Sequence, residues 1–391
     1  MKVCVIGLGY VGLPLSVLLA EIGCEIIGVD TNKELIAKIN SGVCMIHETE
    51  LEERLKMVIA LNKLKVQESP ENADIFVFSV QTPLLNGKPN LDYLNKAFNS
   101  VKPFIKKDNL LIIESTCPVG TSRFLYDKYL DNNSDYQLAY CPERILPGDI
   151  MNELVINDRV IGGIDEVSTN KAIDFYKLFC KGMLLETTAE TAEFVKLIEN
   201  TYRDVNIAFA NELEKIAKEK NINCFEAISL ANKHPRVNIH YPGIGVGGHC
   251  IPKDPVLLTY DSDSAKLIKT ARKINKNKPK EIVSRINEFY KMNIGSFEKS
   301  RIDIGILGLA YKPNTNDFRE SPAIEIMNQL QNMQCFNIKF HDPFITDCNS
   351  IEEIKKCDIV VLLVGHKDYL SINKELKDTK GVNFINFAGD K

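Results

Sequence analysis

The chain has 391 residues, which exceeds the roughly 250–300 residues that a single hydrophobic core usually supports, so we expect two or three domains. Hydrophobic residues make up 45% and charged residues 26% of the chain, a globular composition that excludes collagen-like and broadly disordered classes. The 48 basic residues nearly balance the 52 acidic ones, so we expect no nucleic-acid or membrane partner and favour a small-molecule ligand.

The first half of the chain predicts a parallel α/β domain. Its apolar runs are continuous rather than alternating and are separated by helical stretches, as in a sheet that is covered by helices on both faces. The period then changes to 3.6 residues, which predicts a long amphipathic helix from Thr191 to Lys220. The runs expected as strands are 3–7, 25–30, 75–80, 110–116, 136–143 and 160–163, and the apolar face of the helix carries Phe194, Ile198, Val205, Phe209 and Ile216.

The second half repeats the α/β pattern after a lysine-rich stretch at 262–280, which we interpret as a solvated helical face. Further strands are expected at 302–310, 336–343, 357–365 and 382–387. The predicted fold class is therefore α/β, with two Rossmann-like parallel-sheet domains joined by a long central helix.

A dinucleotide fingerprint follows the first strand. Gly7, Gly9 and Gly12, with Tyr10 and Val11 between them, form a GxGxxG that opens a helix. Such glycines allow a tight turn and let backbone N–H groups approach a pyrophosphate. Asp30 ends the second strand 18 residues beyond Gly12, where a carboxylate accepts ribose hydroxyls. No arginine follows Asp30 to bind a 2′-phosphate, so the pattern favours NAD as the cofactor.

The eleven cysteines include no CxxC pair and no metal-ligand spacing, so we expect reduced thiols, no metal and a cytoplasmic location. The chain begins with a strand-like run rather than a signal peptide, and its longest apolar run, Ile359 to Val364, is too short to span a bilayer.

One cysteine lies in an unusual context. Residues Tyr241 to Cys250 form a glycine-dense loop, and Lys253 and Asp254 follow it. Glycines let backbone crowd a ligand, and a cysteine beside lysine and histidine can have a lowered thiol pKa. Cys250 is therefore the candidate nucleophile, whereas the other cysteines are expected to be packing residues.

The long helix adds polar residues opposite its apolar stripe. Lys196, Asn200 and Arg203 recur at i, i+4 and i+7, so they share one narrow arc, and this mixture suits an oxyanion and a sugar hydroxyl. An NAD site with a nucleophilic thiol suggests oxidation of an aldehyde, because thiolate addition gives a thiohemiacetal whose oxidation yields a hydrolysable thioester.

Seven segments in order along the chain carry a resemblance to a known family. They are GLGYVGLP at 7–14, QTP at 81–83, ESTCPVGT at 114–121, CPERILPG at 141–148, EFVKLIENTYRDVNIAFANE at 193–212, GVGGHCIPKDP at 245–255 and GLAYKPNTNDFRESP at 308–322. Through them the chain resembles the UDP-glucose/GDP-mannose dehydrogenase family over essentially its whole length. This resemblance implies oxidation of C6 of a nucleotide-linked sugar from alcohol to carboxylate with two NAD+, supplying precursors of surface polysaccharides or glycans.

The resemblance assigns roles residue by residue. Cys250 corresponds to the nucleophile, Lys196 and Asn200 to groups that stabilise an oxyanion and an ordered water, Asp254 to an acid/base partner, and Glu143 to a residue that assists the hydrolytic water. The NAD-contacting positions are Thr82, Thr116 and Arg319, together with Gly7, Gly9, Tyr10, Val11, Gly12 and Asp30.

Three segments, 146–163, 202–213 and 234–239, resemble the UDP-N-acetylmannosamine branch of the family more than the UDP-glucose branch. Substrate contacts then fall on Arg159, Val160, Lys196, Asn200, Arg203, His234, Arg236, Gly247, Tyr311 and Lys312. The family pattern implies an NAD-binding domain at 1–190, a central helical domain with the cysteine loop at 191–295 and a UDP-sugar-binding domain at 296–391. It also implies a homodimer formed through the 191–220 helix.

Several alternatives remain open at this point. The sugar could be UDP-glucose or UDP-N-acetylglucosamine, since these substrates differ only at C2. A sugar-nucleotide-binding scaffold without turnover is a non-enzymatic alternative, although Cys250, Lys196 and Asp254 together argue against it. A two-electron 3-hydroxyacid dehydrogenase would share the GxGxxG domain and a lysine–asparagine pair but has no use for the cysteine loop.

Overall fold

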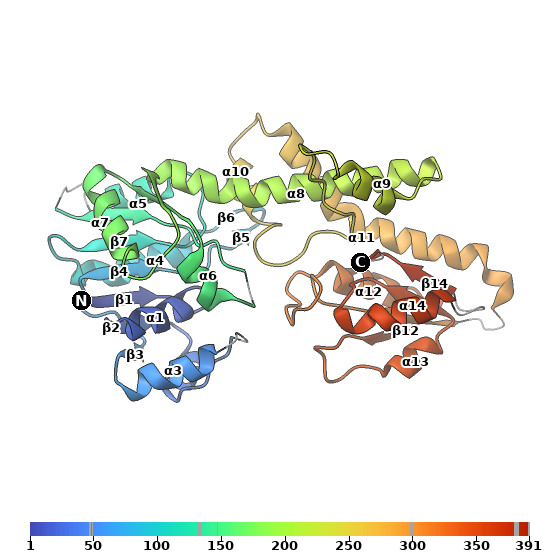
Figure 1. Ribbon diagram of the computed structural model, residues 1–391, viewed down its shortest axis with the longest axis horizontal. Coiled ribbons are helices and arrows are strands. Elements are labelled where there is room, and N and C mark those ends of the chain that lie inside the picture. Colours follow the sequence, from blue (N-terminus) through green and yellow to red (C-terminus); the bar gives the residue numbers. More distant parts are fainter. Residues whose placement is uncertain are drawn as a thin grey trace. The chain divides into compact units, whose positions relative to one another are not determined.

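The structure is a computed structural model that describes residues 1–46, 48, 50–130, 135–146, 148–297, 301–378 and 383–389 (Figure 1). The chain forms two compact units, Met1–Ile198 and Glu199–Lys391, which we call unit 1 and unit 2. The division falls inside the long helix α8 (Ala189–Glu219), so that each unit contains part of this helix.

Unit 1 contains an eight-stranded sheet in the order β10-β9-β8-β7-β4-β1-β2-β3. Helices cover both of its faces, because Val3 and Val5 of β1 enter one hydrophobic core and Cys4 and Ile6 enter another. The strands are β1 (Lys2–Ile6), β2 (Glu25–Val29), β3 (Leu64–Gln67), β4 (Ile75–Phe78), β7 (Leu110–Ile113), β8 (Gln137–Tyr140), β9 (Arg159–Gly163) and β10 (Leu184–Thr188).

A short hairpin of β5 (Leu84–Leu85) and β6 (Lys88–Pro89) follows β4. The helices that connect the strands of unit 1 are α1 (Gly12–Glu21), α2 (Lys33–Asn40), α3 (Leu51–Ala60), α4 (Asp92–Val101), η1 (Lys102–Phe104), α5 (Thr121–Leu130), α6 (Ile150–Ile156) and α7 (Glu166–Tyr176).

The predicted parallel sheet is confirmed with one exception and two additions. β9 pairs antiparallel with β8, which requires no crossover over the sheet, and only the short helix α6 lies between the two strands. The outer strands β3 and β10 were absent from the expectation because their sequences, LKVQ and LLETT, are too polar to form continuous apolar runs.

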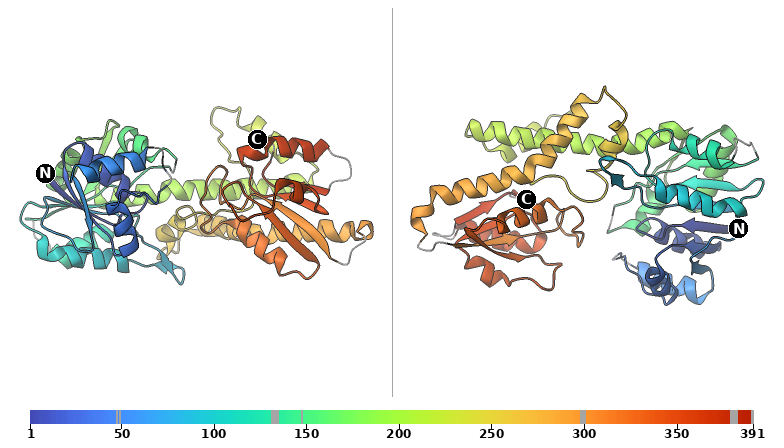
Figure 2. Two further views of the ribbon diagram at one scale, coloured as in Figure 1. Left: turned by 90° about the horizontal axis from the view of Figure 1, so that it is seen from below. Right: turned by 180° about the vertical axis from the view of Figure 1, so that it is seen from behind.

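Unit 2 contains a four-stranded parallel sheet in the order β12-β11-β13-β14. The strands of this sheet are the orange and red arrows in Figure 2. Two hydrophobic clusters flank this sheet, and the first residue of the strand expected at 382–387 lies outside the described residues. The strands are β11 (Ile302–Leu307), β12 (Phe336–His341), β13 (Ile359–Leu362) and β14 (Asn383–Asn386).

The remaining helices of unit 2 include one long helix, α11, and several short ones. They are α9 (Cys224–Ala231), α10 (Asp254–Thr259), α11 (Lys266–Met292), η2 (Ile294–Ser296), α12 (Pro322–Gln331), α13 (Ile351–Lys355), η3 (Lys367–Tyr369) and α14 (Leu370–Asp378). Among the residues that the structure describes, none of the helices is long and apolar enough to cross a membrane.

The interpretation of residues 262–280 as a solvated face is wrong for Lys278. This side chain is fully buried, and its Nζ lies 2.5 Å from Glu214 Oε2 and 3.1 Å from Glu281 Oε1. Glu214 belongs to α8, so α11 turns one of its lysines towards that helix. A buried charge needs such partners, which residue composition alone does not reveal.

Helix α8 reverses the usual amphipathic arrangement. Its polar residues Glu193, Lys196, Asp204 and Asn211 are buried, whereas several of its large apolar residues are exposed. The exposed set is Phe194, Ile198, Tyr202, Phe209 and Ile216. The polar face of α8 thus packs within the chain, and the apolar stripe predicted from the sequence faces outward.

Candidate active site

The glycine loop after β1 leaves space only at its middle glycine. Gly7 has a φ of +94°, and a Cβ there would collide with the carbonyl of Ser79, while a Cβ on Gly12 would collide with the carbonyl of Gly7. Gly9 instead has no described atom within 4 Å of its would-be Cβ. Two glycines therefore serve the protein's own packing, and Gly9 leaves room for a ligand.

Asp30 is held beside this loop. Its Oδ2 accepts a hydrogen bond from the Leu8 N–H at 3.0 Å and its Oδ1 accepts from the Asn32 N–H at 2.9 Å. In the described part of the chain no side chain caps α1, whose N-cap residue is Val11. A helix start without a side-chain cap, an open glycine and an oriented carboxylate fit a dinucleotide pyrophosphate and ribose.

Thr82 and Thr116 are brought together at the carboxyl ends of β4 and β7, on the same edge of the sheet as the glycine loop. The Thr82 hydroxyl donates a hydrogen bond to the Thr116 carbonyl. Ser115 Oγ accepts from the Val80 N–H at 2.9 Å and ties the two loops together. Tyr10 is exposed beside them in the glycine loop.

Glu143 and Lys196 form a close pair in unit 1. Lys196 Nζ donates to the carbonyl oxygen and to Oε1 of Glu143, both at 2.8 Å, and the Ile145 N–H donates to Glu143 Oε2 at 3.1 Å. Burial alone would raise the pKa of Glu143, but the charge and hydrogen bond of Lys196 outweigh it and lower the pKa below its ordinary value. Glu143 is therefore a carboxylate at neutral pH and can hold or activate a water molecule.

Arg159, expected to contact substrate, lies in a buried network of unit 1. Its guanidinium lies 4.8 Å from the centre of the Tyr176 ring, and its Nη1 is 3.7 Å from Glu114 Oε1. The Tyr176 hydroxyl donates to the same oxygen at 2.7 Å. The adjacent Val160 is also buried, and for both residues the substrate role stays a prediction.

The cysteine loop in unit 2 leads directly into α10. Cys250 is exposed, and its carbonyl accepts hydrogen bonds from the N–H groups of Lys253 at 3.0 Å and Asp254 at 2.9 Å. The Asp254 side chain is fully buried, and its Oδ2 accepts from Asn200 Nδ2 at 2.6 Å. One turn of chain thus connects the exposed thiol to the buried carboxylate of Asp254, which is bonded to Asn200 of α8.

Two glycines fasten the cysteine loop to the segment after β11. A Cβ on Gly247 would lie 2.5 Å from the Glu320 carbonyl oxygen, and one on Gly248, whose φ is +81°, would lie 2.8 Å from the Tyr311 ring. The Gly248 N–H donates to the carbonyl of Arg319 at 3.1 Å. Glycine is required here because two backbones meet closely.

His249 is neutral at pH 7. Burial, together with the neighbouring charges of Lys253 and Arg319, lowers the pKa of its imidazole to about 4. The positive charge near Cys250 therefore comes from Lys253 and Arg319, and the sequence-based expectation that histidine would help to lower the thiol pKa is wrong. Arg319, expected to contact NAD, forms a two-point ion pair with Asp317 at 2.9 and 2.6 Å.

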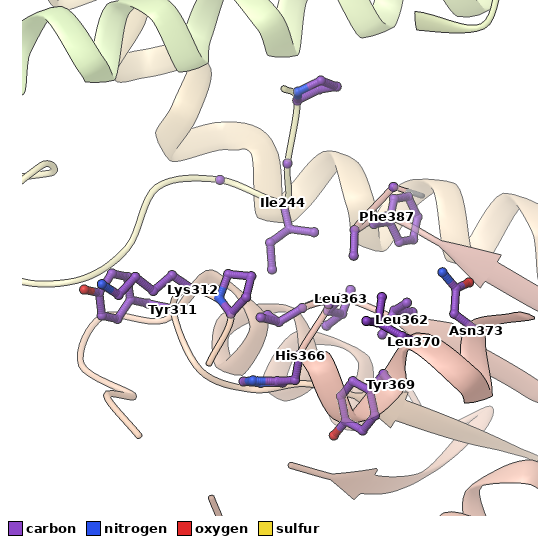
Figure 3. Close-up of a pocket in the computed structure, with 18 residues that line it drawn as sticks. Ile244, Tyr311, Lys312, Leu362, Leu363, His366, Tyr369, Leu370, Asn373 and Phe387 are labelled. Atoms are coloured by element: carbon purple, nitrogen blue, oxygen red, sulfur yellow. The ribbon is translucent and has the colours of Figure 1, made fainter. Parts of the chain in front are cut away.

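A cavity of about 190 Å³ opens beside this segment. Figure 3 shows Tyr311 and Lys312 at one side of it, Ile244 above and His366 and Tyr369 below. The cavity lies at the carboxyl ends of β11 and β13, where parallel sheets of this type bind ligands. Arg203, His234 and Arg236 are exposed elsewhere on unit 2, and their substrate role stays a prediction.

Sequence reasoning missed a buried carboxylate beside the predicted residues. Glu193 is fully buried and accepts hydrogen bonds from the Gly120 N–H at 2.6 Å and from the Ser122 N–H and hydroxyl at 2.7 Å each. Its spacing to Lys196 and Asn200 places all three on one helical face, a signal that could have revealed it. The Asp342–His366 pair of unit 2 had no comparable signal.

Comparison with known proteins gives matches along nearly the whole chain. Residues 1–180, 190–277 and 305–385 match the NAD binding, central and UDP binding domains of the UDP-glucose/GDP-mannose dehydrogenase family. The UDP-N-acetyl-D-mannosamine dehydrogenase of Methanocaldococcus jannaschii is 46% identical over 383 residues, which cover 96% of this chain and 88% of the relative.

Two solved structures have the same fold. The UDP-D-ManNAc dehydrogenase of Pyrococcus horikoshii is 40% identical with a TM-score of 0.93, covering 100% of this chain and 96% of the other. The UDP-N-acetyl-mannosamine dehydrogenase of S. aureus is 37% identical with a TM-score of 0.88, covering 99% of each chain. With the NAD-binding fingerprint and the cysteine loop in place, the chain belongs to the UDP-glucose/GDP-mannose dehydrogenase family and is an NAD-dependent dehydrogenase.

Proposed function

We propose that this protein oxidises C6 of UDP-N-acetyl-D-mannosamine from a primary alcohol to a carboxylate, with two NAD+ as oxidants. The observation that carries the proposal is the exposed Cys250, one turn before the buried Asp254, whose carboxylate accepts a hydrogen bond from Asn200. Relatives named as UDP-N-acetyl-D-mannosamine dehydrogenases, at 41–46% identity, support this sugar over glucose. The product would serve the synthesis of surface polysaccharides or glycans.

Residues of unit 1 suit the binding of NAD, which accepts a hydride from the substrate carbon in each oxidation. The open Gly9 and the uncapped N-terminus of α1 would receive the pyrophosphate, and Asp30 would accept the ribose hydroxyls. Thr82, Thr116 and Arg319 are proposed as further contacts, as are Gly7, Tyr10, Val11 and Gly12 of the same loop.

Cys250 would act between the two oxidations. The first oxidation removes a hydride and a proton from the alcohol and leaves an aldehyde. The Cys250 thiolate then adds to the aldehyde carbon, forming a C–S bond and an oxyanion that takes up a proton as the thiohemiacetal. Removal of a second hydride and the hydroxyl proton gives the thioester, and water cleaves its C–S bond to release the carboxylate and the thiol.

Lys196 and Asn200 are proposed to stabilise the oxyanion, since a cation and an amide N–H donor both favour developing negative charge. Glu143, kept ionised by Lys196, would orient the hydrolytic water. Asp254 would exchange the last proton. The proposed substrate contacts are Arg159, Val160, Lys196, Asn200, Arg203, His234, Arg236, Gly247, Tyr311 and Lys312.

We also propose a homodimer formed through α8, because its exposed apolar stripe suits a second copy of the same helix. We propose three functional domains: an NAD-binding domain at 1–190, a central helical domain with the cysteine loop at 191–295 and a UDP-sugar-binding domain at 296–391. A cytoplasmic location is proposed from the eleven cysteines, of which no two described residues form a disulfide.

The experiment is incubation of the protein with UDP-N-acetyl-D-mannosamine and excess NAD+, measuring NADH by absorbance and the uronate by chromatography. Two NADH per uronate are expected, without a released aldehyde. A ratio of one NADH per product would contradict the four-electron reaction. UDP-glucose and UDP-N-acetylglucosamine run in parallel, and faster turnover of either would reassign the sugar.

The Cys250→Ala variant tests the nucleophile. It should form no carboxylate, while its affinity for NAD+ stays within about twofold of the wild type, because the thiol adds to substrate carbon and is not part of the Gly7–Gly12 loop proposed to bind NAD. Cys348→Ala, which removes a half-buried thiol of unit 2, is the matched control and should retain turnover. Acid production by Cys250→Ala would rule out the assigned nucleophile.

A further inference from the structure

The loop after β11 is held at both of its ends by two buried side chains. Asp342, which follows β12, accepts hydrogen bonds through Oδ2 from the N–H groups of Leu309 at 2.7 Å and Ala310 at 3.1 Å. His366, which follows β13, accepts through Nδ1 from the Asn314 N–H at 3.0 Å. Tyr311 and Lys312 lie between these anchored residues.

The two anchors are joined to each other. His366 Nε2 lies 3.2 Å from Asp342 Oδ2. Because Nδ1 already accepts a hydrogen bond, Nε2 carries the proton and donates a hydrogen bond to the carboxylate. Both side chains are at most 1% exposed. Burial alone would raise the pKa of Asp342, but the hydrogen bonds from His366 and the loop N–H groups lower it, so the carboxylate is ionised.

The tip of the loop is fixed as well. Asn314 has a left-handed φ of +58°, and its Oδ1 accepts from the Lys367 N–H at 2.8 Å. The Ser321 hydroxyl donates to the Leu309 carbonyl at 2.7 Å. The loop is thus bonded by residues that follow β12 and β13, the two strands that flank β11, and by a residue at the start of α12.

The same position in unit 1 is used differently. Asp30 follows β2 as Asp342 follows β12, and it accepts from the Leu8 N–H just as Asp342 accepts from Leu309. Asp30, however, is half-buried, whereas Asp342 is fully buried and bonded to His366. The Asp342 carboxylate therefore cannot accept hydrogen bonds from a ribose, and it holds the loop after β11 instead.

We infer that Asp342 and His366 are positioning residues for nucleotide-sugar binding, acting by fixing the loop that carries Tyr311 and Lys312. This inference rests on the proposed function, in which those two residues contact the substrate. We call Asp342 and His366 the clamp. Because Gly248 packs on the Tyr311 ring, the clamp also sets the position of the chain that leads to Cys250. The glycine loop and Asp30, which are proposed to bind NAD, belong to unit 1, whereas Asp342 and His366 belong to unit 2. Of the proposed NAD contacts only Arg319 lies in the segment after β11.

The test uses the full-length protein with Asp342→Asn and His366→Gln. The first removes the charge that receives the loop N–H groups, and the second keeps a donor for Asp342 but removes the acceptor for Asn314. Binding of UDP, measured by titration calorimetry, should weaken about tenfold in each variant, while binding of NAD+ stays within about twofold of the wild type. Hydrogen exchange at Leu309, Ala310 and Asn314 should become faster.

Asp358→Asn is the matched control. Asp358 Oδ2 accepts from the Asp303 N–H at 2.8 Å at the opposite edge of the same sheet, so this variant should lose stability without weakening UDP binding. Unchanged UDP binding in the two clamp variants, despite faster exchange of the loop, would overturn the inference. Absence of UDP binding in the wild type would instead overturn the nucleotide site itself, and with it the proposed function.

Discussion

At the scale of single residues, the Glu143–Lys196 pair is a buried ion pair to which we have also assigned a proposed chemical role. Both side chains are largely withdrawn from solvent, at 13% and 6% exposure. Removing one partner of a buried ion pair costs about 3–5 kcal/mol, because the other charge stays buried without compensation. The pair therefore stabilises unit 1 only while both of its members are present.

We predict that Lys196→Met lowers the free energy of unfolding by about 3 kcal/mol and abolishes turnover. Adding Glu143→Gln should recover a large part of the stability, because a neutral amide then replaces the unpaired buried carboxylate. The double variant should still have no activity. Urea denaturation of the wild type, both single variants and the double variant completes the cycle. Additive losses of stability in the double variant would contradict the pairing.

His249 gives a prediction about the reactivity of Cys250. Since the pKa of His249 is lowered to about 4, its imidazole does not change charge between pH 6 and 9. The rate at which iodoacetamide alkylates Cys250 should therefore follow one titration, that of the thiol, and His249→Gln should leave its midpoint unchanged. Peptide mass spectrometry separates Cys250 from the other cysteines. A midpoint that moves in His249→Gln would show that the imidazole is charged in the protein.

Residues that sequence reasoning identified are those with local signals. Gly7, Gly9, Gly12 and Asp30 belong to one βαβ unit, and the Leu8–Asp30 hydrogen bond joins residues only 22 apart. The Glu143–Lys196 pair joins residues 53 apart, and the His366–Asn314 bond joins residues 52 apart. Pairing over such separations depends on which strand ends become neighbours, which periodicity does not specify.

At the scale of elements, α8 is connected to α5 through Glu193. This carboxylate receives the N–H groups of Gly120 and Ser122 at the start of α5, where the helix dipole favours negative charge. The same loop begins just after Thr116, a proposed NAD contact. Glu193 therefore fixes the helix that carries Lys196 relative to the strand end that carries Thr116.

The pKa of Glu193 predicts how unit 1 responds to pH. Burial raises this pKa from 4.5 to about 7, so the folded state binds the proton more tightly than the unfolded state does. The stability contributed by Glu193 is highest below pH 4.5 and falls as the pH rises to about 7, by up to roughly 3 kcal/mol. Glu193→Gln removes this dependence.

The comparison requires urea denaturation of the wild type and Glu193→Gln at pH 5 and pH 8. The stability of the wild type relative to the variant should be lower at pH 8 than at pH 5. Glu186→Gln, which replaces an exposed carboxylate on β10, is the control and should change stability by less than about 0.5 kcal/mol. An equal difference at both pH values would refute a raised pKa.

At the scale of the whole molecule, helix α8 exposes its apolar residues and buries its polar ones. Packing within one chain does not explain this arrangement. A sequence pattern reports that Phe194, Ile198, Phe209 and Ile216 share a face, but it does not report whether that face is covered by the same chain or by another. The described residues bury the polar face instead, through bonds such as Asn275 to Asp204 and Lys278 to Glu214. The exposed stripe supports the proposed homodimer, since exposed apolar residues in such a row mark interaction sites.

Phe209→Glu should therefore convert the protein from a dimer into a monomer with the 44.0 kDa mass of one chain, because a charge in the centre of an apolar interface costs several kcal/mol to bury. Sedimentation equilibrium measures the mass directly. Leu61→Glu, which places the same charge on an exposed leucine outside the stripe, should remain dimeric. If the wild type is itself monomeric at micromolar concentration, or if Phe209→Glu remains a dimer, α8 does not form the interface.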